Sequence, residues 1–403
     1  MIGAILLIIF LYFISQVILG YFKKQYPFIK LKLLTNLYWW HTLFALIYYL
    51  YAVINRSDSE AYYKRAASDF VYTSWVSIYQ TGTRFIDFVS FPFINSLGFS
   101  YEMAMVLFAW FGYLGFIYFY IFFKEQVKSS LKFYGYDLIM LLLFLPNMHF
   151  WTASLGKGSL IFLGIAMFAY GLVAPQKRIL TLLVGSLIVY HVRPHMFLFL
   201  GIGAVGGYIT GNEKVPFYQK ALVYVAFIGG LALMYDQILA FAKLDENNVL
   251  DSFQNFSQVQ ANRLDSAGSG VDINSYPLPL KLFTFWFRPL FFDAPGALGL
   301  YISVENLFYL ALVWKLVDKD FISFLKKSSS LVKMSLVTFI SSSIALSMVM
   351  ANLGIVIRQK SMVMYFFFFI ILAFMEYKHR KKTGITEEGE AMVTTPRKRL
   401  RLV

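Results

Sequence analysis

The sequence predicts an all-α protein, a polytopic transmembrane helical bundle with about 11 spanning helices. Hydrophobic residues make up 59% of the 403 positions, whereas charged residues make up only 14%. Soluble domains usually carry about 25% charged residues, so lipid is the expected solvent. The 28 Tyr and 43 Phe residues fit helices that contact acyl chains and headgroups.

Apolar runs recur along the chain, and a membrane span needs roughly 20 apolar residues. The first run lacks a basic n-region and a small-residue cleavage site, so we expect a retained helix and not a cleaved signal peptide. Pro146 interrupts the fourth run. The expected spans are 2–22, 36–54, 101–123, 134–151, 159–174, 179–192, 196–211, 221–242, 299–317, 332–352 and 361–377.

Lys and Arg are distributed unevenly between the two sets of connections. Alternate connections and the C-terminal tail hold 24 of the 36 Lys and Arg residues. These connections are 23–35, 124–133, 175–178, 212–220 and 315–333. Because basic loops stay in the cytoplasm, the pattern predicts an N-terminus outside and a C-terminus in the cytoplasm.

Two long connections fall on the external side of this topology, 55–100 and 243–298. The second half of 55–100 is aromatic and apolar, so we expect interfacial or re-entrant helices there. Loops longer than about 12–15 residues are usually functional or disordered, and two on one face suggest a cap over a site. We therefore expect one transmembrane domain, 1–377, followed by a basic, disordered cytoplasmic tail, 378–403.

Composition also excludes several classes of chemistry. The chain has no cysteine, which excludes disulfides, thiolate metal sites and a cysteine nucleophile. His191 and His195 have the spacing of two metal ligands on a helix, but Pro194 breaks the helix between them. We expect no metal and no cofactor.

The net charge of +14 does not indicate nucleic acid, because most basic residues lie at the ends of apolar runs. The tail is either a solvated basic segment or a ligand for anionic lipid.

The external face carries basic side chains that are candidates for substrate binding. A charge at membrane depth costs roughly 2.5–3.5 kcal/mol, so such residues are retained for a reason. Any single one could snorkel to lipid phosphates or form a structural ion pair. Several beneath a cap favour an anion site, because the planar guanidinium donates two parallel hydrogen bonds to phosphate. The candidates are Arg193, Arg288, Arg358, Lys157, His195 and Arg84.

Two carboxylates are candidates for the base that would activate a sugar hydroxyl. Asp58 follows the second span, but Ser57, Asp58 and Ser59 also fit the start of a short helix, EAYYKRAA. Glu305 lies early in the ninth span and could instead pair with a buried arginine.

Four stretches resemble one group of bacterial membrane proteins. They are SDSEAYY, PNMHFWTASLGKGSLIF, FRPLFFDAPGALGLYISVENL and NLGIVIRQK. The chain resembles the O-antigen-polymerase-like and exopolysaccharide-polymerase-like families, within the wider group of GT-C-type glycosyltransferases. The resemblance implies synthesis of surface polysaccharide from undecaprenyl-linked glycan at the outer face of the inner membrane, together with other polysaccharide-assembly proteins.

The resemblance also implies roles for particular residues. External arginines of such polymerases bind the pyrophosphate-linked glycan, a role that falls here to Arg193, Arg288 and Arg358, with Lys157 as a fourth. The acidic residue of the first external loop in GT-C enzymes corresponds to Asp58. The expected external face has no DxD motif, which argues against a metal-dependent mechanism. A DxD at 318–320 lies in a predicted cytoplasmic loop, where a solvated turn is the simpler interpretation.

Two other function classes stay open at this point. A flippase or transporter for lipid-linked oligosaccharide would also use intramembrane arginines, but it predicts charges through the depth of the bundle and on both faces. A non-catalytic membrane scaffold predicts that changing the arginines leaves activity intact.

Overall fold

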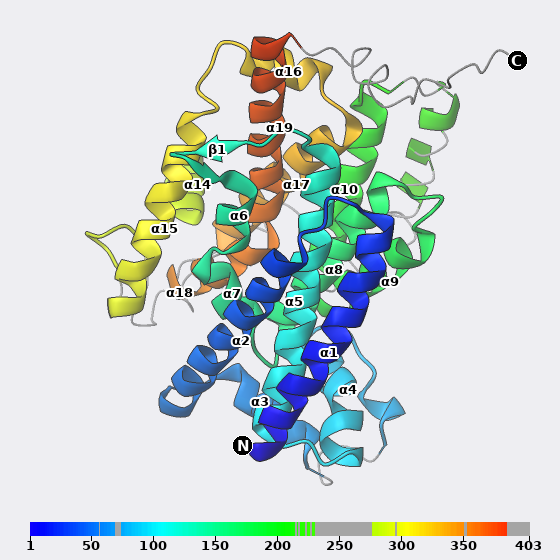
Figure 1. Cartoon of the computed structure of the whole chain (residues 1–403), viewed down its shortest axis with the longest axis vertical. Coiled ribbons are helices and arrows are strands. Elements are labelled where there is room, and N and C mark those ends of the chain that lie inside the picture. Colours follow the sequence, from blue (N-terminus) through cyan, green and yellow to red (C-terminus); the bar gives the residue numbers. More distant parts are fainter. Residues whose placement is uncertain are drawn as a thin grey trace, which may run out of the picture.

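The described part of the chain is helical, with one short β-hairpin (Figure 1). The computed structural model describes residues 1–55, 57–68, 74–213, 276–294, 296–349 and 353–384, and a few positions within 216–229. Most of the predicted span 221–242, most of the loop 243–298 and most of the basic tail therefore lie outside the described residues.

The N-terminal half contains long helices joined by turns, and a group of short helices between α2 and α5. Its elements are α1 (Ile2–Gln25), α2 (Leu31–Ile54), α3 (Asp58–Ala66), η1 (Val76–Ile78), α4 (Thr83–Phe91), η2 (Pro92–Ser96), α5 (Tyr101–Gln126), β1 (Lys132–Phe133), β2 (Tyr136–Asp137), α6 (Leu138–Leu143), α7 (Pro146–Thr152), α8 (Lys157–Val173), α9 (Ile179–Val192) and α10 (Pro194–Thr210).

The C-terminal part ends in a pair of helices separated by a bend. Its elements are α14 (Leu278–Phe287), α15 (Gly296–Trp314), α16 (Phe321–Lys327), α17 (Ser330–Val349), α18 (Leu353–Gln359), η3 (Lys360–Met362) and α19 (Met364–Thr383).

Several of these helices are long and apolar enough to span a membrane. They are α1, α2, α5 and α17, and the pair α18–α19 forms a fifth if its 56° bend lies within one span. The helices α8, α9, α10, α14 and α15 are apolar but shorter. The length and composition of these helices are thus consistent with a membrane protein, and the count of about 11 spans remains a prediction.

The expected span 134–151 is divided in the structure. A tight turn at Tyr134 and Gly135, both with positive φ, joins β1 to β2. Asp137 then caps α6 by accepting a hydrogen bond from the Met140 backbone N–H at 3.0 Å. Pro146 stands in the first turn of α7, where its missing N–H costs no helical hydrogen bond. The proline that interrupts the run therefore begins a second short helix.

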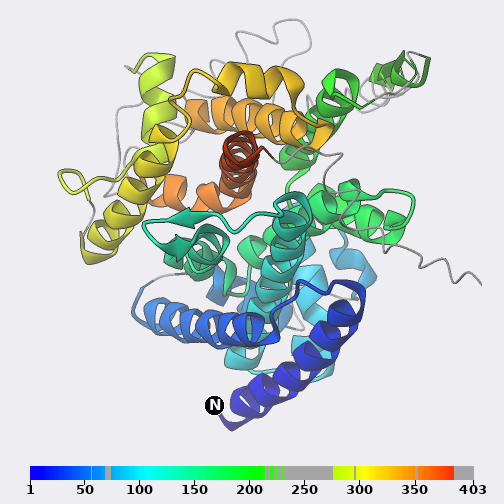
Figure 2. The same cartoon turned by 45° about the horizontal axis from the view of Figure 1, so that its top comes forward.

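The core is formed by α5 and the first half of α19, which are the most buried long segments. Phe116, Phe119, Phe162 and Tyr365 pack their rings together where α5, α8 and α19 meet. Figure 2 shows α19 end-on, between the α15–α17 part of the chain and α5. These aromatic contacts hold α8, whose first residue, Lys157, lines the cavity described below.

Helix α10 packs directly against α17 through glycines. A Cβ added to Gly207 would lie 2.3 Å from the backbone oxygen of Ser330, and one added to Gly203 would lie 1.9 Å from Thr338 Oγ1. Small residues allow this close approach of two helices, as is typical of membrane-protein interfaces.

The connections predicted to be cytoplasmic meet at one end of the bundle. Arg178 binds both oxygens of Glu125, at 2.5 and 2.8 Å, and also donates to the hydroxyl of Tyr26. The backbone N–H of Ser129 donates to Glu376 at 3.0 Å. These contacts join the turns after α1, α5 and α8 to the end of α19.

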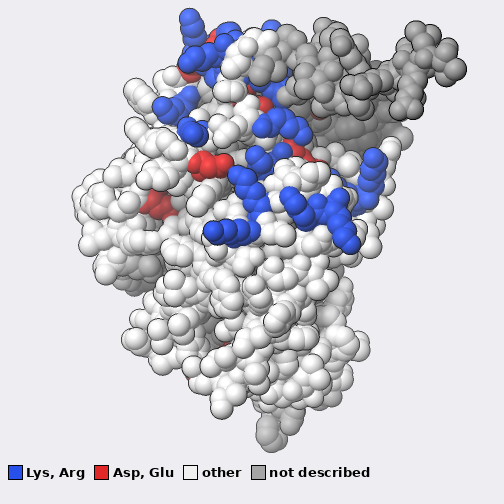
Figure 3. Space-filling view, viewed as in Figure 1, with Lys and Arg blue, Asp and Glu red and all other residues white. Residues whose placement is uncertain are grey.

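The remaining basic turns lie at this same end. The backbone N–H of Ser330 donates to Glu213 at 2.9 Å, and Lys378 binds Asp318 at 2.9 Å. Figure 3 shows Lys and Arg gathered on the upper half of the visible face, around the end of α19, while the lower part is nearly free of charge. The basic connections, which alternate along the sequence, thus lie together at one end of the helical bundle.

Candidate functional site

The opposite end of the bundle carries the short helices of the long connection between α2 and α5. Ser57 is the N-cap of α3, and its hydroxyl accepts a hydrogen bond from the Ser59 backbone N–H at 3.3 Å. Asp58 is the first residue of α3, which confirms the short helix expected there. The hydroxyls of Ser59 and Tyr101 lie 2.6 Å apart, which attaches α3 to α5.

Helix α4 is held between α3 and the turn that joins α9 to α10. Arg65 donates from Nε and Nη2 to the two oxygens of Asp87, at 2.8 and 3.0 Å, and Asp87 is fully buried. The Gly82 N–H donates to the backbone oxygen of His191 at 2.7 Å. The Tyr79 hydroxyl also lies 2.5 Å from His191 Nε2. This loop is therefore fixed directly beside Arg193.

A cavity of about 300 Å³ lies where these elements meet α8 and α18. It brings together four of the residues that the sequence predicted, from four separate elements: Asp58, Lys157, Arg193 and Arg358. The other lining residues are Ala61, Tyr62, Arg65, Thr83, Ile355 and Gln359. We refer to this space as the cationic cavity. Helices α3 and α4, which form part of its wall, lie at the lower end of Figure 1, away from the end of α19.

The cavity contains more positive than negative side chains. Arg358 Nη1 donates to Asp58 Oδ2 at 2.8 Å, and Arg65 is paired with Asp87. Among the described residues, no carboxylate pairs with Arg193 or Lys157, and Arg193 Nε is buried without a hydrogen-bond partner. The cavity therefore has an excess of two positive charges, which favours an anionic ligand.

The other predicted base, Glu305, does not line this cavity. It is buried in α15 and accepts hydrogen bonds from the Asn147 backbone N–H, at 3.0 Å, and from the hydroxyl of Tyr309. Among the described residues these partners, and not the expected buried arginine, satisfy its side chain. Glu305 therefore joins α15 to α7 and is not in a position to share the chemistry of Asp58.

Arg288 also lies apart from the cationic cavity. Its guanidinium forms an ion pair with Asp293 and reaches Tyr276 and Thr284 at 3.5 and 3.4 Å. The sequence had placed it with Arg193 and Arg358, but here its charge is neutralised within the turn after α14. The guanidinium thus has a structural partner of its own.

The last two predicted binding residues lie near the cavity but not on its wall. His195 is the second residue of α10, just after Arg193. Arg84 is exposed on α4, next to Thr83, which does line the cavity. Neither side chain lines the cavity, although Arg193 and Thr83, close to each of them in the sequence, do.

Sequence reasoning assigned no role to two further residues, Arg65 and Lys360. Arg65 lies two helical turns after Asp58, so the helical period of α3 places both on one face. Lys360 is fully buried, and its Nζ donates to the backbone oxygen of Arg288 at 2.9 Å and to Asn306 Oδ1 at 2.6 Å. The sequence signal that could have pointed to Lys360 is its position two residues after Arg358.

The DxD at 318–320 forms ion pairs at the opposite end of the bundle. Lys378 binds Asp318 and Asp320, at 2.9 and 3.0 Å, and Lys381 binds Asp320 at 2.8 Å. Hydrogen bonds from Lys381 and Lys378 lower the pKa of Asp320. Within the described residues, no three His, Asp or Glu side chains come together as metal ligands.

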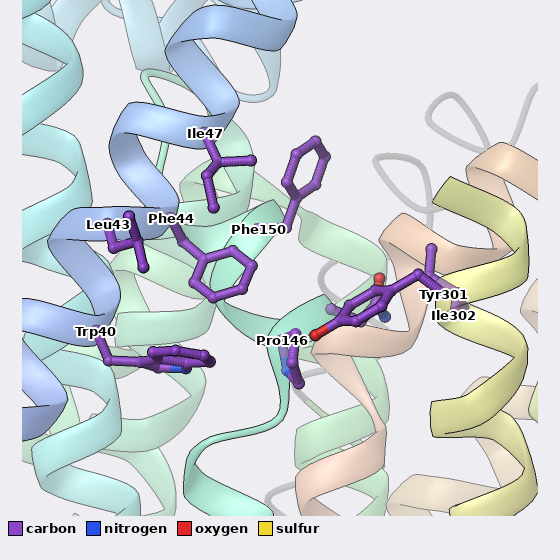
Figure 4. A pocket seen from close by; sticks show the side chains of 9 residues that line it. Trp40, Leu43, Phe44, Ile47, Pro146, Phe150, Tyr301 and Ile302 are labelled. Atoms are coloured by element: carbon purple, nitrogen blue, oxygen red, sulfur yellow. The ribbon is translucent and has the colours of Figure 1, made fainter. Parts of the chain in front are cut away.

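A second cavity, of about 310 Å³, lies between α2 and α15 and is almost entirely apolar. In Figure 4, Trp40, Phe44 and Ile47 extend from α2 on one side, facing Tyr301 on α15, with Pro146 and Phe150 between them. Leu43, Asn147 and Ile302 complete the lining. Leu43 and Tyr301 are 45% and 49% exposed, so this apolar cavity opens sideways toward the region that lipid would occupy.

Comparison of the chain with known proteins does not assign it to a family. No family model matches the chain, and no curated protein or solved structure shows a significant match. The fold and the site are those of a helical protein with several helices able to span a membrane and a cationic cavity near one end.

Proposed function

We propose that this protein is a surface-polysaccharide polymerase or a related glycosyltransferase that uses undecaprenyl-pyrophosphate-linked glycan. The observation that carries the proposal is the cationic cavity, in which Arg193, Lys157 and Arg358 surround a single lining carboxylate, Asp58. Arginine and lysine recognise phosphate oxygens, and a carboxylate is a suitable base for a sugar hydroxyl. These two requirements coincide in glycosyl transfer from a lipid diphosphate.

The proposed chemistry is a single displacement. Asp58 takes the proton of the acceptor hydroxyl while the hydroxyl oxygen forms a bond to the anomeric carbon of the donor. The bond from that carbon to the pyrophosphate breaks, and the pyrophosphate leaves with the electron pair. Arg193, Lys157 and Arg358 stabilise the negative charge that develops on this leaving group.

The apolar cavity supports the lipid part of the proposal. Asn147 on α7 lines the apolar cavity, and its Nδ2 donates to the backbone oxygen of Ile357 on α18 at 3.4 Å. Arg358, the next residue, lines the cationic cavity. Thus α7, which lines the apolar cavity, is hydrogen-bonded to α18, which lines the cationic cavity. A carrier with an apolar chain and an anionic head requires two such neighbouring regions.

The location follows from the charge of the two ends. The basic turns meet at the end that carries Asp318, and the cationic cavity lies near the other end. If the basic end is cytoplasmic, the cavity faces the outer side of the bacterial inner membrane. The proposed partners are the lipid-linked glycan, membrane lipid and other polysaccharide-assembly proteins.

Complementation in the native host tests the proposal. Arg193→Ala and Arg358→Ala are expressed at matched levels, and surface polysaccharide is resolved as a length ladder. A polymerase predicts loss of the ladder with single repeat units retained. A normal ladder from both variants would contradict the proposal and favour a non-catalytic scaffold.

One observation favours a second candidate, a flippase or transporter for lipid-linked oligosaccharide. Lys360 is buried at the 56° break between α18 and α19, near the buried Glu305. Buried charges at broken helices are typical of transporters. A transporter predicts that the same variants lose single repeat units from the surface as well as the ladder.

A further inference from the structure

The two ion pairs of the cationic cavity differ in how firmly their carboxylates are held. Asp87 is fully buried and receives two hydrogen bonds from Arg65. Asp58 is 65% exposed and receives one hydrogen bond from Arg358. Exposed single-bond pairs contribute little stability, whereas a buried bidentate pair is costly to break. Only the Asp58 carboxylate can therefore be exchanged for another anion at low cost.

Asp58 also occupies the position that an anionic ligand would take. A carboxylate and a phosphate oxygen compete for the same guanidinium donors. Arg193 and Lys157 leave two positive charges in the same cavity without a carboxylate partner among the described residues. A diphosphate that reaches these two cations is then close to Arg358, and its charge exceeds that of one carboxylate.

We infer that Asp58 is an internal competitor for the anion site, displaced from Arg358 when the donor diphosphate binds. The inference rests on the proposed function and adds regulation of the same site. In the empty cavity the carboxylate is bound to Arg358. Once the diphosphate replaces it, the carboxylate is released beside the donor and can accept the proton of the incoming hydroxyl. The base thus becomes available only when the leaving group is already held.

Binding of inorganic pyrophosphate to the purified full-length protein tests this displacement. Isothermal titration in detergent at low ionic strength compares the wild type with Asp58→Asn. Removal of the competing carboxylate is expected to tighten binding by about fivefold, the factor that corresponds to no longer breaking one ion pair with an exposed carboxylate. Asp58→Glu, which keeps a carboxylate, is expected to bind close to the wild-type value.

Glu60 provides the matched control. It is on the same helix and pairs with Lys64 at 2.6 Å, at the exposed surface. Glu60→Gln removes the same charge without vacating Arg358, and we expect a change in affinity of less than about twofold. An equal gain in this variant would overturn the inference, because long-range charge alone would then explain it.

The remaining outcomes separate the inference from the proposed function. If the wild type binds pyrophosphate and Asp58→Asn binds equally or more weakly, the carboxylate positions Arg358 and does not compete with the ligand. The anion site would then stand while the displacement fails. If neither protein binds pyrophosphate, both the displacement and the proposed anion site are wrong.

Discussion

Lys360 provides the sharpest test of how the segment that carries Arg358 is held. Its ammonium is fully buried and donates to the backbone oxygen of Arg288 and to Asn306 Oδ1, at 2.9 and 2.6 Å. Glu305 lies close enough to interact with its charge. Lys360→Met keeps the length and apolar character of the side chain but removes the charge and both hydrogen bonds.

The expected cost follows from these contacts. Hydrogen bonds from a charged donor contribute about 1.5–3 kcal/mol each, and removal of one member of a buried charge network costs about 3–5 kcal/mol. We expect Lys360→Met to lower the free energy of unfolding by about 3–5 kcal/mol. The control Lys64→Met removes an exposed lysine that pairs with Glu60, and it should cost at most about 1 kcal/mol.

Equilibrium unfolding in mixed detergent and SDS micelles, followed by tryptophan fluorescence, measures both variants. The chain has seven Trp residues, so the signal reports on several helices. Equal stability of the two variants would refute the argument that buried lysine contacts hold α18 to α15.

Three further predictions concern packing, pH and orientation. Gly207→Ala is expected to destabilise the protein by about 1–3 kcal/mol, because the added Cβ would lie 2.3 Å from its nearest atom. Gly206→Ala is expected to be neutral or stabilising, because its added Cβ would lie 3.6 Å from its nearest atom. Thermal unfolding of both variants checks this difference. Asp320→Asn is expected to lower the unfolding temperature at neutral pH. The difference from the wild type should shrink as the pH falls below about 4, because a carboxyl group with a lowered pKa loses its contribution to stability once it is protonated. Equal differences in unfolding temperature at neutral pH and below about pH 4 would contradict the prediction. Because the chain has no cysteine, Thr81→Cys should react with an impermeant maleimide from outside intact cells and Ser130→Cys should not, and the reverse result would invert the orientation.

Much of the coarse architecture could be predicted from composition and charge spacing. The apolar runs gave α1, α2, α5 and α17, and the basic turns all meet at one end of the bundle. Lipid as solvent forces backbone hydrogen bonds to be made within each helix, so apolar length alone is informative. Pro146 signalled the break in 134–151, whereas the β-turn at Tyr134 and Gly135 that shortens the start of this run was not foreseen.

Four of the eight residues that the sequence selected line the cationic cavity, and the other four do not. Asp58, Lys157, Arg193 and Arg358 line one cavity because helix ends from distant segments converge there. Arg288 could not be separated from them by sequence, since its partner Asp293 is a local turn residue and either role fits the pattern. Three-dimensional packing decides which charges are neutralised, and a single sequence does not record it.

The most direct test of the account is pyrophosphate binding by Arg193→Ala. Arg193 has a buried Nε without a described partner, so a bound phosphate would supply its missing acceptor. Loss of a charge-assisted hydrogen bond of about 1.5–3 kcal/mol predicts an affinity about 10- to 150-fold weaker than wild type. The matched variant Lys64→Ala, which removes an exposed positive charge from α3, should retain nearly full affinity. Wild-type affinity in Arg193→Ala would contradict the claim that this cavity binds the diphosphate.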